Sequence, residues 1–387
     1  MSIKNIAVVT VGRSDYGIYY PIFKEFEKQK INFGLLVSGS HLSAEFGNTV
    51  NVIKKDGFPV LEEIPVLADV DGPTGIIESM ARSTLGFGQF YKEHNLDLLI
   101  LLGDRFEMHA AAVAAVPYNI PIAHIHGGEI SEGAIDNAFR HSITKLSHFH
   151  FVSTELSSAR VLAMGENPAH VIVSGAPGLD NVLKLDLLGR EVISEIIGIK
   201  SDSPFLLVTY HPVTLEIEDL AVQIDNLIAA LEDIDTQVVF TASNADNGGR
   251  FINEKLRDRS SNDERFLFCE NLGTQVYFSA MQYASAMIGN SSSGIIEAAS
   301  FKLPVVNIGS RQDGRERSLN VIDTGYGKDQ INEAIKKALS IEYQGSLKDI
   351  ENIYGSGRAS EKIVNYINEL TLERSILKKP FYFNAIQ

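Results

Sequence analysis

The chain has 387 residues, of which 44% are hydrophobic and 21% charged, and its formal net charge is −15. This length predicts two globular α/β domains rather than one hydrophobic core. The acidic charge argues against nucleic acid as a partner, and no apolar run approaches the roughly 20 residues that span a bilayer, so we expect no nucleic-acid or membrane partner.

Short apolar runs alternate with stretches of helical periodicity, a pattern typical of parallel strands connected by helices. The strands predicted in the first half are Ile6–Val11, Phe33–Val37, Leu98–Leu102, Ile120–Ile125, Phe149–Val152 and Val171–Ser174. The helices predicted there are Tyr19–Lys28, Thr74–His94, Phe106–Val116, Ile135–Leu146 and Glu155–Met164.

A polar stretch near residues 184–203 precedes a second series of strands. These strands are Phe205–Thr209, Gln237–Phe240, Phe266–Phe268, Ala286–Ile288 and Val305–Ile308, with helices between them. Two such series predict an α/β protein with two Rossmann-like doubly wound domains, residues 1–183 and 184–359, and an active site in the cleft between them. We expect a C-terminal helical segment, residues 360–387, to join the first domain.

Parallel sheets bind ligands beyond the carboxyl ends of their strands, so the loops after the strands are the places to search for a site. The first such loop contains G-R-S-D-Y-G (residues 12–17), in which Arg13 can pair with a phosphate. It is neither a dinucleotide fingerprint nor a P-loop, and a turn capped by Ser14 or Asp15 is the structural alternative. The second loop contains G-S-H-L, and its single His41 is a weak indication by itself.

The strand that ends at Leu102 is followed by G-D-R-F-E (residues 103–107). An acid and a base at a strand end, leading into a helix, are typical of an active site. Asp104 as a helix N-cap, with Arg105 in a surface ion pair, is the structural alternative.

Residues 124–141, H-I-H-G-G-E-I-S-E-G-A-I-D-N-A-F-R-H, form the densest polar stretch. His124 and His126 face the same side of an extended strand, and Asp136 and Arg140 share a face of a helix. A solvated ion pair would explain Asp136 and Arg140 alone. A structural loop has little use for three histidines, three carboxylates and two adjacent glycines, so we interpret the whole stretch as functional.

The H-x-H motif beside G-D-x-x-E also suggests a metal site of the kind found in metallophosphoesterases. That site needs an upstream D-x-H and a downstream G-N-H. In this chain Gly289-Asn290 is followed by Ser291, and no D-x-H occurs early. Because the ligand count and spacing do not complete a site, we predict no metal.

Three strand-end loops of the second half carry groups suited to a nucleotide. Y-H-P-V-T (residues 210–214) places His211 after a strand, where it could contact a phosphate or a sugar hydroxyl. N-A-D-N-G-G (residues 244–249) offers Asn244 and Asp246 to a ribose or a base. In G-N-S-S-S-G (residues 289–294), hydroxyls and free N–H groups at a helix start suit a pyrophosphate, although a plain Ser N-cap is the alternative.

The last predicted strand is followed by S-R-Q-D-G-R-E-R (residues 310–317). It contains Arg311, Arg315 and Arg317 in a chain of net charge −15. Cations gathered in a strand-end loop of such a chain indicate a positive potential focused on a binding cleft.

Taken together, these motifs resemble those of the hydrolysing UDP-N-acetylglucosamine 2-epimerases, including the enzymes that supply N-acetylmannosamine for sialic acid. The likeness runs from Gly12 to Arg317 and rests on G-R-S-D-Y, G-S-H-L, G-D-R-F-E, H-I-H-G-G-E with D-x-x-x-R-H, H-P-V-T, G-N-S-S-S-G and S-R-Q-x-G-R-E in this order. The resemblance implies a glycosyltransferase-B-like pair of domains. It also implies anti elimination of UDP to a 2-acetamidoglucal, which water converts to the free 2-epimer, with no metal and no nicotinamide cofactor.

The resemblance assigns roles to the matching positions of the first half. Asp104 becomes a catalytic carboxylate and Arg105 a cation of the cleft. Asp136 becomes a second acid or base, and Arg140 a partner that holds charge. We place Asp15, in the first of these motifs, among the substrate-binding residues.

In the second half the resemblance makes His211 a ligand on the pyrophosphate side. Ser291 and Ser292 become diphosphate ligands, and Glu297 contacts the ribose. The remaining substrate-binding residues that we predict are Arg13 and Arg311, which would bracket the nucleotide, and His41, Asn244 and Asp246.

The chain departs from the resemblance at one catalytic position. Many members have H-I-E-G-G-E, in which the first Glu is thought catalytic, and His126 stands there in this chain. One extra residue also separates Glu129 from Asp136. Either His126 or Glu129 could be the general base; a His near its ordinary pKa suits proton abstraction at neutral pH. We favour an arrangement in which His126 and Glu129 share the role of general base.

Four alternatives stay open at this point. One keeps the chemistry but uses a UDP-2,4-diacetamido-2,4,6-trideoxyhexose, on the route to legionaminic acid. The others are a non-hydrolysing epimerase, a glycosyltransferase of the same architecture and a nucleotide-sugar sensor without catalysis. We expect a homo-oligomer, a dimer or tetramer. A single cysteine, Cys269, and no export signal indicate a cytoplasmic protein.

Overall fold

A computed structural model describes residues 5–44, 47–70, 72–130, 135–243, 248–270 and 272–383. The described chain divides into two compact units. Unit 1 takes the described residues up to 130, then 135–183 and those from 354 onwards, and unit 2 takes those between 184 and 353.

Unit 1 is built on a parallel sheet of seven strands in the order β3-β2-β1-β4-β5-β6-β7. The strands are β1 (Ile6–Thr10), β2 (Phe33–Ser38), β3 (Val60–Ile64), β4 (Leu98–Leu102), β5 (Ile122–Ile125), β6 (Phe149–Val152) and β7 (Val171–Val173). The α-helices are α1 (Arg13–Gln29), α2 (Val50–Lys55), α3 (Gly72–Glu93), α4 (Phe106–Ala115), α5 (Asp136–Leu146), α6 (Glu155–Ala163), α7 (Gly178–Lys184) and α15 (Ala359–Glu369). Short 3-10 turns are η1 (Gly39–Leu42), η2 (Val116–Tyr118), η3 (Pro168–His170) and η6 (Arg374–Lys378).

Unit 2 is built on a parallel sheet of six strands in the order β10-β9-β8-β11-β12-β13. The strands are β8 (Phe205–Thr209), β9 (Gln237–Thr241), β10 (Phe266–Cys269), β11 (Ala286–Gly289), β12 (Val305–Ile308) and β13 (Val321–Thr324). The α-helices are α8 (Arg190–Ile197), α9 (Leu220–Glu232), α10 (Gly249–Asn262), α11 (Gly273–Tyr283), α12 (Ser292–Ile296), α13 (Lys328–Leu339) and α14 (Ile341–Ser346). The 3-10 turns are η4 (Thr214–Asp219) and η5 (Ala298–Phe301).

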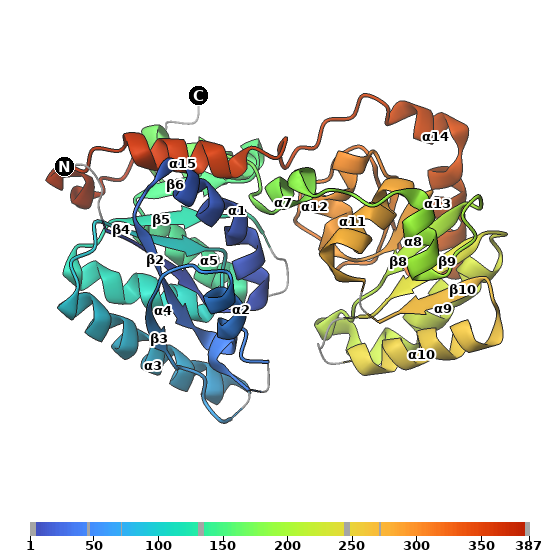
Figure 1. The fold of residues 1–387 in the computed structure, drawn as a ribbon, viewed down its shortest axis with the longest axis horizontal. Coiled ribbons are helices and arrows are strands. Elements are labelled where there is room, and N and C mark those ends of the chain that lie inside the picture. Colours follow the sequence, from blue (N-terminus) through green and yellow to red (C-terminus); the bar gives the residue numbers. More distant parts are fainter. Residues whose placement is uncertain are drawn as a thin grey trace. The chain divides into compact units, whose positions relative to one another are not determined.

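The core of each unit follows from the continuous apolar runs in the sequence. Every residue of β1 and of β4 is buried, as expected for parallel strands covered on both faces. The C-terminal helix α15 belongs to unit 1, where it packs beside α1 (Figure 1). Gln29 of α1 donates a hydrogen bond to Asn365 of α15 at 2.7 Å.

Several elements differ from the sequence prediction. The edge strands β3 and β13 were not predicted, because neither is a run of buried apolar residues. Helix α8 lies inside the polar stretch 184–203; it buries Ile193 and Ile197 and exposes its other side. Helix α1 begins at Arg13 instead of Tyr19, so G-R-S-D-Y-G forms a helix start rather than a loop.

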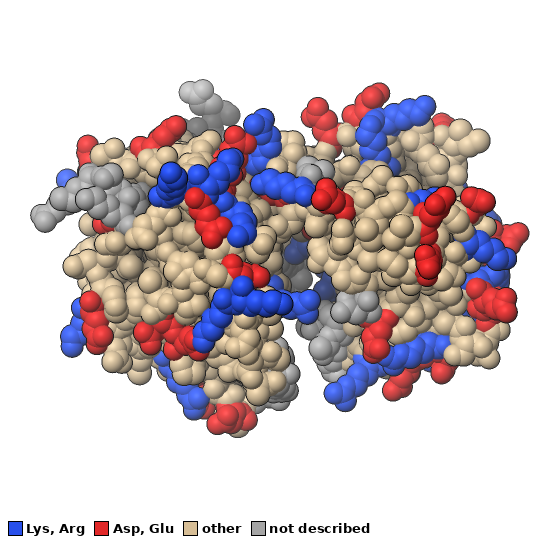
Figure 2. Space-filling model, in the orientation of Figure 1, with Lys and Arg blue, Asp and Glu red and all other residues tan. Residues whose placement is uncertain are grey.

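That the chain binds no nucleic acid stays a prediction, and the charge on one face of its surface bears on it. On the face drawn in Figure 2, Lys and Arg side chains are interspersed with Asp and Glu. A phosphate backbone requires a more continuous basic surface. Within the described residues, no helix has the length and apolar character needed to cross a membrane.

Candidate active site

The strand orders locate one candidate edge in each unit. In unit 1 the order reverses between β1 and β4, and in unit 2 it reverses between β8 and β11. Ligands of open parallel sheets bind beyond the carboxyl ends of the strands at such a reversal. Most of the predicted site residues that the structure describes follow these strands or their neighbours.

In unit 1 one guanidinium gathers three predicted catalytic residues. Arg140, buried in the second turn of α5, donates through Nη2 to Oδ2 of Asp104 and through Nη1 to the backbone oxygen of His126 at 2.8 Å. Nη1 also lies 3.8 Å from Oε2 of Glu129. Arg140 therefore neutralises carboxylates from two different strand-end loops and fixes their spacing.

His126 and Glu129 form a direct pair. His126 has a left-handed backbone (φ 63°), which turns the chain directly after β5. Its Nδ1 contacts Oε1 of Glu129, and the same oxygen accepts a hydrogen bond from Ser153 Oγ at 2.7 Å. In a neutral imidazole, a carboxylate at Nδ1 keeps the proton on that nitrogen and leaves the lone pair on Nε2. Nε2 is buried and has no hydrogen-bond partner among the described residues.

Asp136, the first residue of α5, lies in the electrostatic field of this cluster. Burial raises its pKa, the negative charge of Asp104 raises it further, and Arg105 and Arg140 counter only part of the increase. A carboxyl group with a raised pKa, close to the carboxylate of Asp104, suits a reaction that needs both an acid and a base.

Arg105 follows Asp104 and is partly exposed, with Nε 3.4 Å from Oε2 of Glu107. It also interacts electrostatically with Asp15 and Asp136, so its positive charge stabilises three carboxylates. Glu107 is completely buried, and burial raises its pKa despite the nearby guanidinium. Glu107 belongs to the G-D-R-F-E motif, but no role was predicted for it.

Asp15 and His41, predicted to bind substrate, are buried in a hydrogen-bond network of their own unit. Oδ2 of Asp15 accepts from Thr10 Oγ1 at 2.9 Å and from the N–H of Val11 at 2.7 Å. The ring of His41 lies 2.9 Å from Thr10 Oγ1 and 2.7 Å from Thr49 Oγ1. Burial raises the pKa of Asp15 to about 6 and lowers that of His41 to about 4. These contacts stabilise the end of β1, and a substrate contact stays a prediction.

In unit 2 an amide ties the two central loops together. The backbone N–H of His211, after β8, donates to Oδ1 of Asn290 at 2.7 Å, and Nδ2 of Asn290 donates back to the oxygen of His211 at 2.8 Å. Arg311 Nη1 and Gln312 Nε2 donate to the backbone oxygen of Asn290 at 3.1 and 2.8 Å. The predicted residues His211 and Arg311 therefore meet around the loop that follows β11.

Ser291 and Ser292 lie at the start of the short helix α12. Ser291 is its N-cap, with Oγ accepting from the N–H of Ser293 at 3.4 Å. Gly289 has φ 133°, and a Cβ at this position would lie 2.0 Å from the oxygen of Thr209, so only glycine lets β11 end so close to β8. Glu297 follows α12, and burial raises its pKa to about 7. The N-cap is therefore present, and diphosphate binding by the two serines stays a prediction.

Of the three remaining predicted residues, the structure describes only Arg13. Arg13 is exposed at the first position of α1. Asn244 and Asp246 lie outside the described residues. Ser153, which sequence analysis missed, directly follows β6 and binds Glu129. Its position after a strand was the available signal, but Ser-Thr before a helix is also an ordinary capping sequence.

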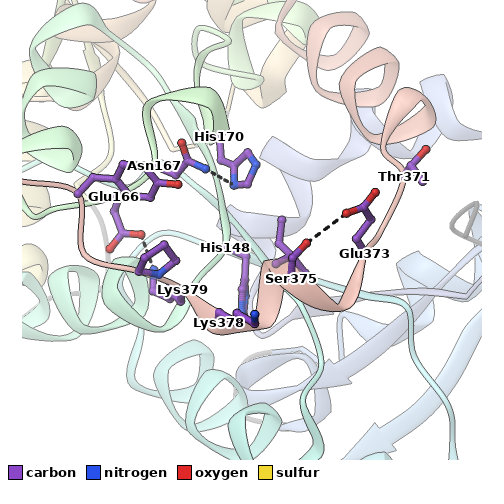
Figure 3. Close-up of a pocket in the computed structure, with 12 residues that line it drawn as sticks. His148, Glu166, Asn167, His170, Thr371, Glu373, Ser375, Lys378 and Lys379 are labelled. Carbon is purple, nitrogen blue, oxygen red and sulfur yellow. Dashed lines mark hydrogen bonds and ion pairs between the residues drawn. The ribbon is translucent and has the colours of Figure 1, made fainter.

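A second polar cluster lies at the opposite edge of the unit 1 sheet, beside a cavity of about 510 Å³ (Figure 3). His148 and His170 precede β6 and β7 there, and the C-terminal segment supplies Lys379. Glu166 contacts Lys379, Lys145 (2.5 Å) and His150 (3.1 Å). Burial alone would raise the pKa of Glu166, but these three hydrogen bonds lower it to about 2. The cluster fastens the C-terminal segment to unit 1.

No group of three or more His, Cys, Asp or Glu within the described part of the chain stands where it could hold a metal ion. In the cluster of unit 1, His126 contacts Glu129, and Asp104 contacts Arg140. A reaction without a metal stays a prediction.

Comparison with known proteins places these features in a family. A family model described as UDP-N-acetylglucosamine 2-epimerase matches residues 24–368. The UDP-N,N'-diacetylbacillosamine 2-epimerase (hydrolyzing) of Legionella pneumophila is 38% identical over 382 residues, which are 97% of this chain and 99% of the relative. The GDP/UDP-N,N'-diacetylbacillosamine 2-epimerase (hydrolyzing) of Campylobacter jejuni is 35% identical, over 89% of this chain and 90% of the relative.

Among solved structures, the UDP-GlcNAc 2-epimerase of Neisseria meningitidis, bound to UDP-GlcNAc, has a TM-score of 0.80. It is 20% identical, and the match covers 94% of this chain and 99% of that structure. This likeness confirms the predicted fold class, an α/β protein with two Rossmann-like, glycosyltransferase-B-like domains. With a family match across most of its length and relatives above 30% identity, the chain belongs to the UDP-N-acetylglucosamine 2-epimerase family.

Proposed function

We propose that the chain is a hydrolysing 2-epimerase, which converts a UDP-N-acetylhexosamine and water into UDP and the free 2-epimeric sugar. The observation that supports this most directly is the cluster of Asp104, His126, Glu129 and Arg140 at one sheet edge. It combines a nitrogen base held by a carboxylate with a second carboxylate held by a guanidinium.

The first step is elimination. The C2–H of an N-acetylhexosamine is a very weak acid, so its removal must accompany the departure of UDP. We assign proton removal to Nε2 of His126, because Glu129 holds the imidazole through Nδ1 and Ser153 holds Glu129. The C2–H electron pair becomes the C1=C2 bond of the 2-acetamidoglucal, and the C1–O pair leaves with UDP.

The second step is hydration with inversion at C2. Water adds its oxygen to C1 and loses a proton, and a new proton enters C2 from the face opposite to the one that lost it. We assign delivery of this proton to Asp136, because burial and the charge of Asp104 keep it protonated to a higher pH than an ordinary Asp. Asp104, ion-paired with Arg140, is the acceptor that we assign for the proton of water.

Unit 2 holds UDP in this proposal. Its central loops carry hydroxyl, amide and guanidinium groups, the donors that anions prefer. His211, Ser291 and Arg311 surround the Asn290 loop, which supports their assignment to the diphosphate. Ser292, at the helix start, completes the set, and Glu297 remains the residue assigned to the ribose.

The sugar has two candidates. UDP-N-acetylglucosamine would give N-acetylmannosamine, the precursor of sialic acid. The second candidate is UDP-N,N'-diacetylbacillosamine, a UDP-2,4-diacetamido-2,4,6-trideoxyhexose. The names of the relatives with 38% and 35% identity support the second candidate, since they give UDP- and GDP/UDP-N,N'-diacetylbacillosamine as the sugar nucleotide, whereas the name of a 33% identical relative, polysialic acid biosynthesis protein P7 of Escherichia coli, supports the first.

One experiment tests the function for both sugars. The protein is incubated with each UDP-sugar in D₂O and followed by proton and phosphorus NMR. We expect free UDP and a reducing 2-epimer with deuterium at C2. Accumulation of a UDP-linked 2-epimer without free UDP would contradict the hydrolysing assignment. A product that keeps the original C2 hydrogen would contradict elimination, and UDP release that requires an added sugar acceptor would indicate a glycosyltransferase.

A further inference from the structure

Two residues of unit 2 that we assign to the diphosphate, His211 and Arg311, are joined through Asn290. Its Oδ1 accepts from the N–H of His211 at 2.7 Å, and its backbone oxygen accepts from Nη1 of Arg311 at 3.1 Å. The residues directly before these two, Tyr210 and Ser310, are joined by a second hydrogen-bonded bridge. The two loops therefore meet along two successive residues, and the second bridge has no role in the proposal above.

The centre of the second bridge is Glu216, in the 3-10 turn η4. Its Oε1 accepts from Oγ of Ser310 at 2.5 Å. Its Oε2 accepts from Nε2 of Gln223 at 3.3 Å and from the hydroxyl of Tyr326. Gln223, buried in α9, accepts in turn from the hydroxyl of Tyr210 at 3.0 Å. Both carboxylate oxygens thus hold donors, and these donors come from three separate segments of the unit.

Tyr326, after β13, fixes the backbone where the loop 310–317 begins. Gly309 (φ 73°) turns the chain after β12, and a Cβ there would lie 2.1 Å from ring atoms of Tyr326, so the ring packs directly on this turn. The N–H of Ser310 donates to the hydroxyl oxygen of Tyr326 at 3.1 Å. Because that hydroxyl gives its own proton to Glu216, its lone pairs stay available to this N–H. Glu216 therefore holds Ser310 through its side chain and, by way of Tyr326, through its backbone.

We propose that Glu216 is a positioning residue of the UDP site: by holding Ser310 and Tyr326, it sets the direction in which Arg311 leaves the end of β12. The proposal rests on the assignment of Arg311 to the diphosphate. Glu216 does not need to touch the nucleotide, and a carboxylate near an anion would by itself repel it. Its place among these loops is explained by the donors that it holds, since hydrogen bonds to an ionised acceptor are stronger than those between neutral groups.

Two glutamates of the same turn provide the first test. Glu216→Ala removes the bridge, whereas Glu218→Ala removes an equal charge from an exposed position of η4. In calorimetric titrations we expect Glu216→Ala to raise the Kd for UDP about 5- to 20-fold, the usual range for losing hydrogen bonds to a charged group. Glu218→Ala should change it by less than about 2-fold. Glu216→Gln, whose amide can still bond both hydroxyls, should restore most of the affinity.

A double-mutant cycle with Arg311→Ala separates positioning from a general structural role. If Glu216 acts through Arg311, adding Glu216→Ala to the Arg311→Ala variant should change the Kd by less than about 2-fold, because the side chain that it positions is gone. General damage to unit 2 would weaken UDP binding by the same factor in both backgrounds. That equal factor, or an unchanged Kd in Glu216→Ala alone, would overturn the proposal. Thermal unfolding of each variant shows whether it is folded at the temperature of the titration.

UDP binding needs no turnover, so the two failures can be told apart. If the wild type binds UDP and shows this coupling but converts neither UDP-sugar, the hydrolysing function is wrong and the positioning role of Glu216 stands. If the wild type releases UDP from a UDP-sugar but Glu216→Ala binds UDP as the wild type does, the positioning role is wrong and the function stands. A wild type that does not bind UDP would overturn both.

Discussion

The candidate edges of the two sheets use different chemistry. In unit 1 ionisable side chains bind one another: Asp104 binds Arg140, and His126 binds Glu129. In unit 2 an asparagine amide joins the loops, and Arg311 binds a backbone oxygen. Carboxyl groups and imidazoles, which gather in unit 1, can exchange protons near neutral pH, whereas amides, hydroxyls and guanidinium groups keep theirs. The edge of unit 1 is therefore suited to proton transfer and that of unit 2 to holding an anion.

The amino edge of the unit 1 sheet sharpens this contrast. Glu166 has three cationic or imidazole partners, and its pKa is lowered to about 2. At the carboxyl edge, the pKa values of Asp136 and Glu107 are raised. A carboxylate with every oxygen paired stays ionised and stabilises the fold. A carboxyl group with a raised pKa takes up a proton more readily than an ordinary one.

Removing the proton carriers of unit 1 should have the largest effect. We expect Asp104→Asn and Asp136→Asn to lower kcat by about 10²-fold or more, because an amide cannot act as an acid or base, and to leave UDP affinity unchanged. UDP release measures the first quantity and calorimetry the second. Glu155→Gln is the matched control, since Glu155 begins α6 as Asp136 begins α5, but is exposed. Full activity in both Asn variants would leave His126 and Glu129 as the remaining candidates.

The pH dependence of stability tests the buried acid at the end of β1. The folded pKa of Asp15 is about 6, above the ordinary 3.8, so folding is favoured by its proton. This contribution is complete below pH 4 and is lost as the pH rises through 6, by about 3 kcal/mol at most. The unfolding free energy of wild type minus that of Asp15→Asn, from urea unfolding at pH 4 to 7.5, should fall across this window. A difference that stays constant with pH would show that the pKa of Asp15 is not raised.

The sequence allowed the edges to be located because each one follows a strong apolar run. Asp104 and His126 come within two residues of the ends of β4 and β5, and Ser291 follows Asn290, the first residue after β11, so identifying the strand also identified the candidate site. Ser153 was missed because its role depends on Glu129, 24 residues earlier, and contact between two loops is not visible in local spacing. The reach of Arg140 from helix α5 to Asp104 likewise depends on the order of the strands rather than on residue types.

Weakening the anion site of unit 2 should have an intermediate effect. We expect Arg311→Ala and Ser291→Ala each to reduce UDP affinity by about 1–3 kcal/mol, because each removes a donor or disturbs the Asn290 loop that presents it. Calorimetric titration with UDP gives the values. Lys336→Ala, an exposed cation of α13, controls for the loss of general positive charge. Unchanged affinity in both variants would move the diphosphate to other residues.

Loosening the support of the proposed base should have a smaller effect. Ser153→Ala removes one hydrogen bond to Glu129 and leaves the contact of Glu129 with His126 in place. A net loss of about 1 kcal/mol corresponds to roughly a 5-fold decrease in kcat/KM. UDP affinity should not change. Ser153→Thr, which keeps the hydroxyl, should restore most of the activity, and a loss in Ser153→Thr equal to that in Ser153→Ala would argue for a packing role instead.

Chelation of metal ions should have no effect on activity, which is the smallest effect that we expect. A metal would need several open ligands converging on one point, and the donors of the densest polar stretch already contact one another: Nδ1 of His126 contacts Glu129, and Asp104 contacts Arg140. A divalent ion at this edge would also have to displace the buried positive charge of Arg140. UDP release by enzyme treated with excess EDTA and then freed of it by gel filtration should therefore equal that of untreated enzyme. Loss of activity on chelation, with recovery on adding one particular divalent ion, would show that a metal enters between these groups and would replace the proton-transfer assignment for unit 1.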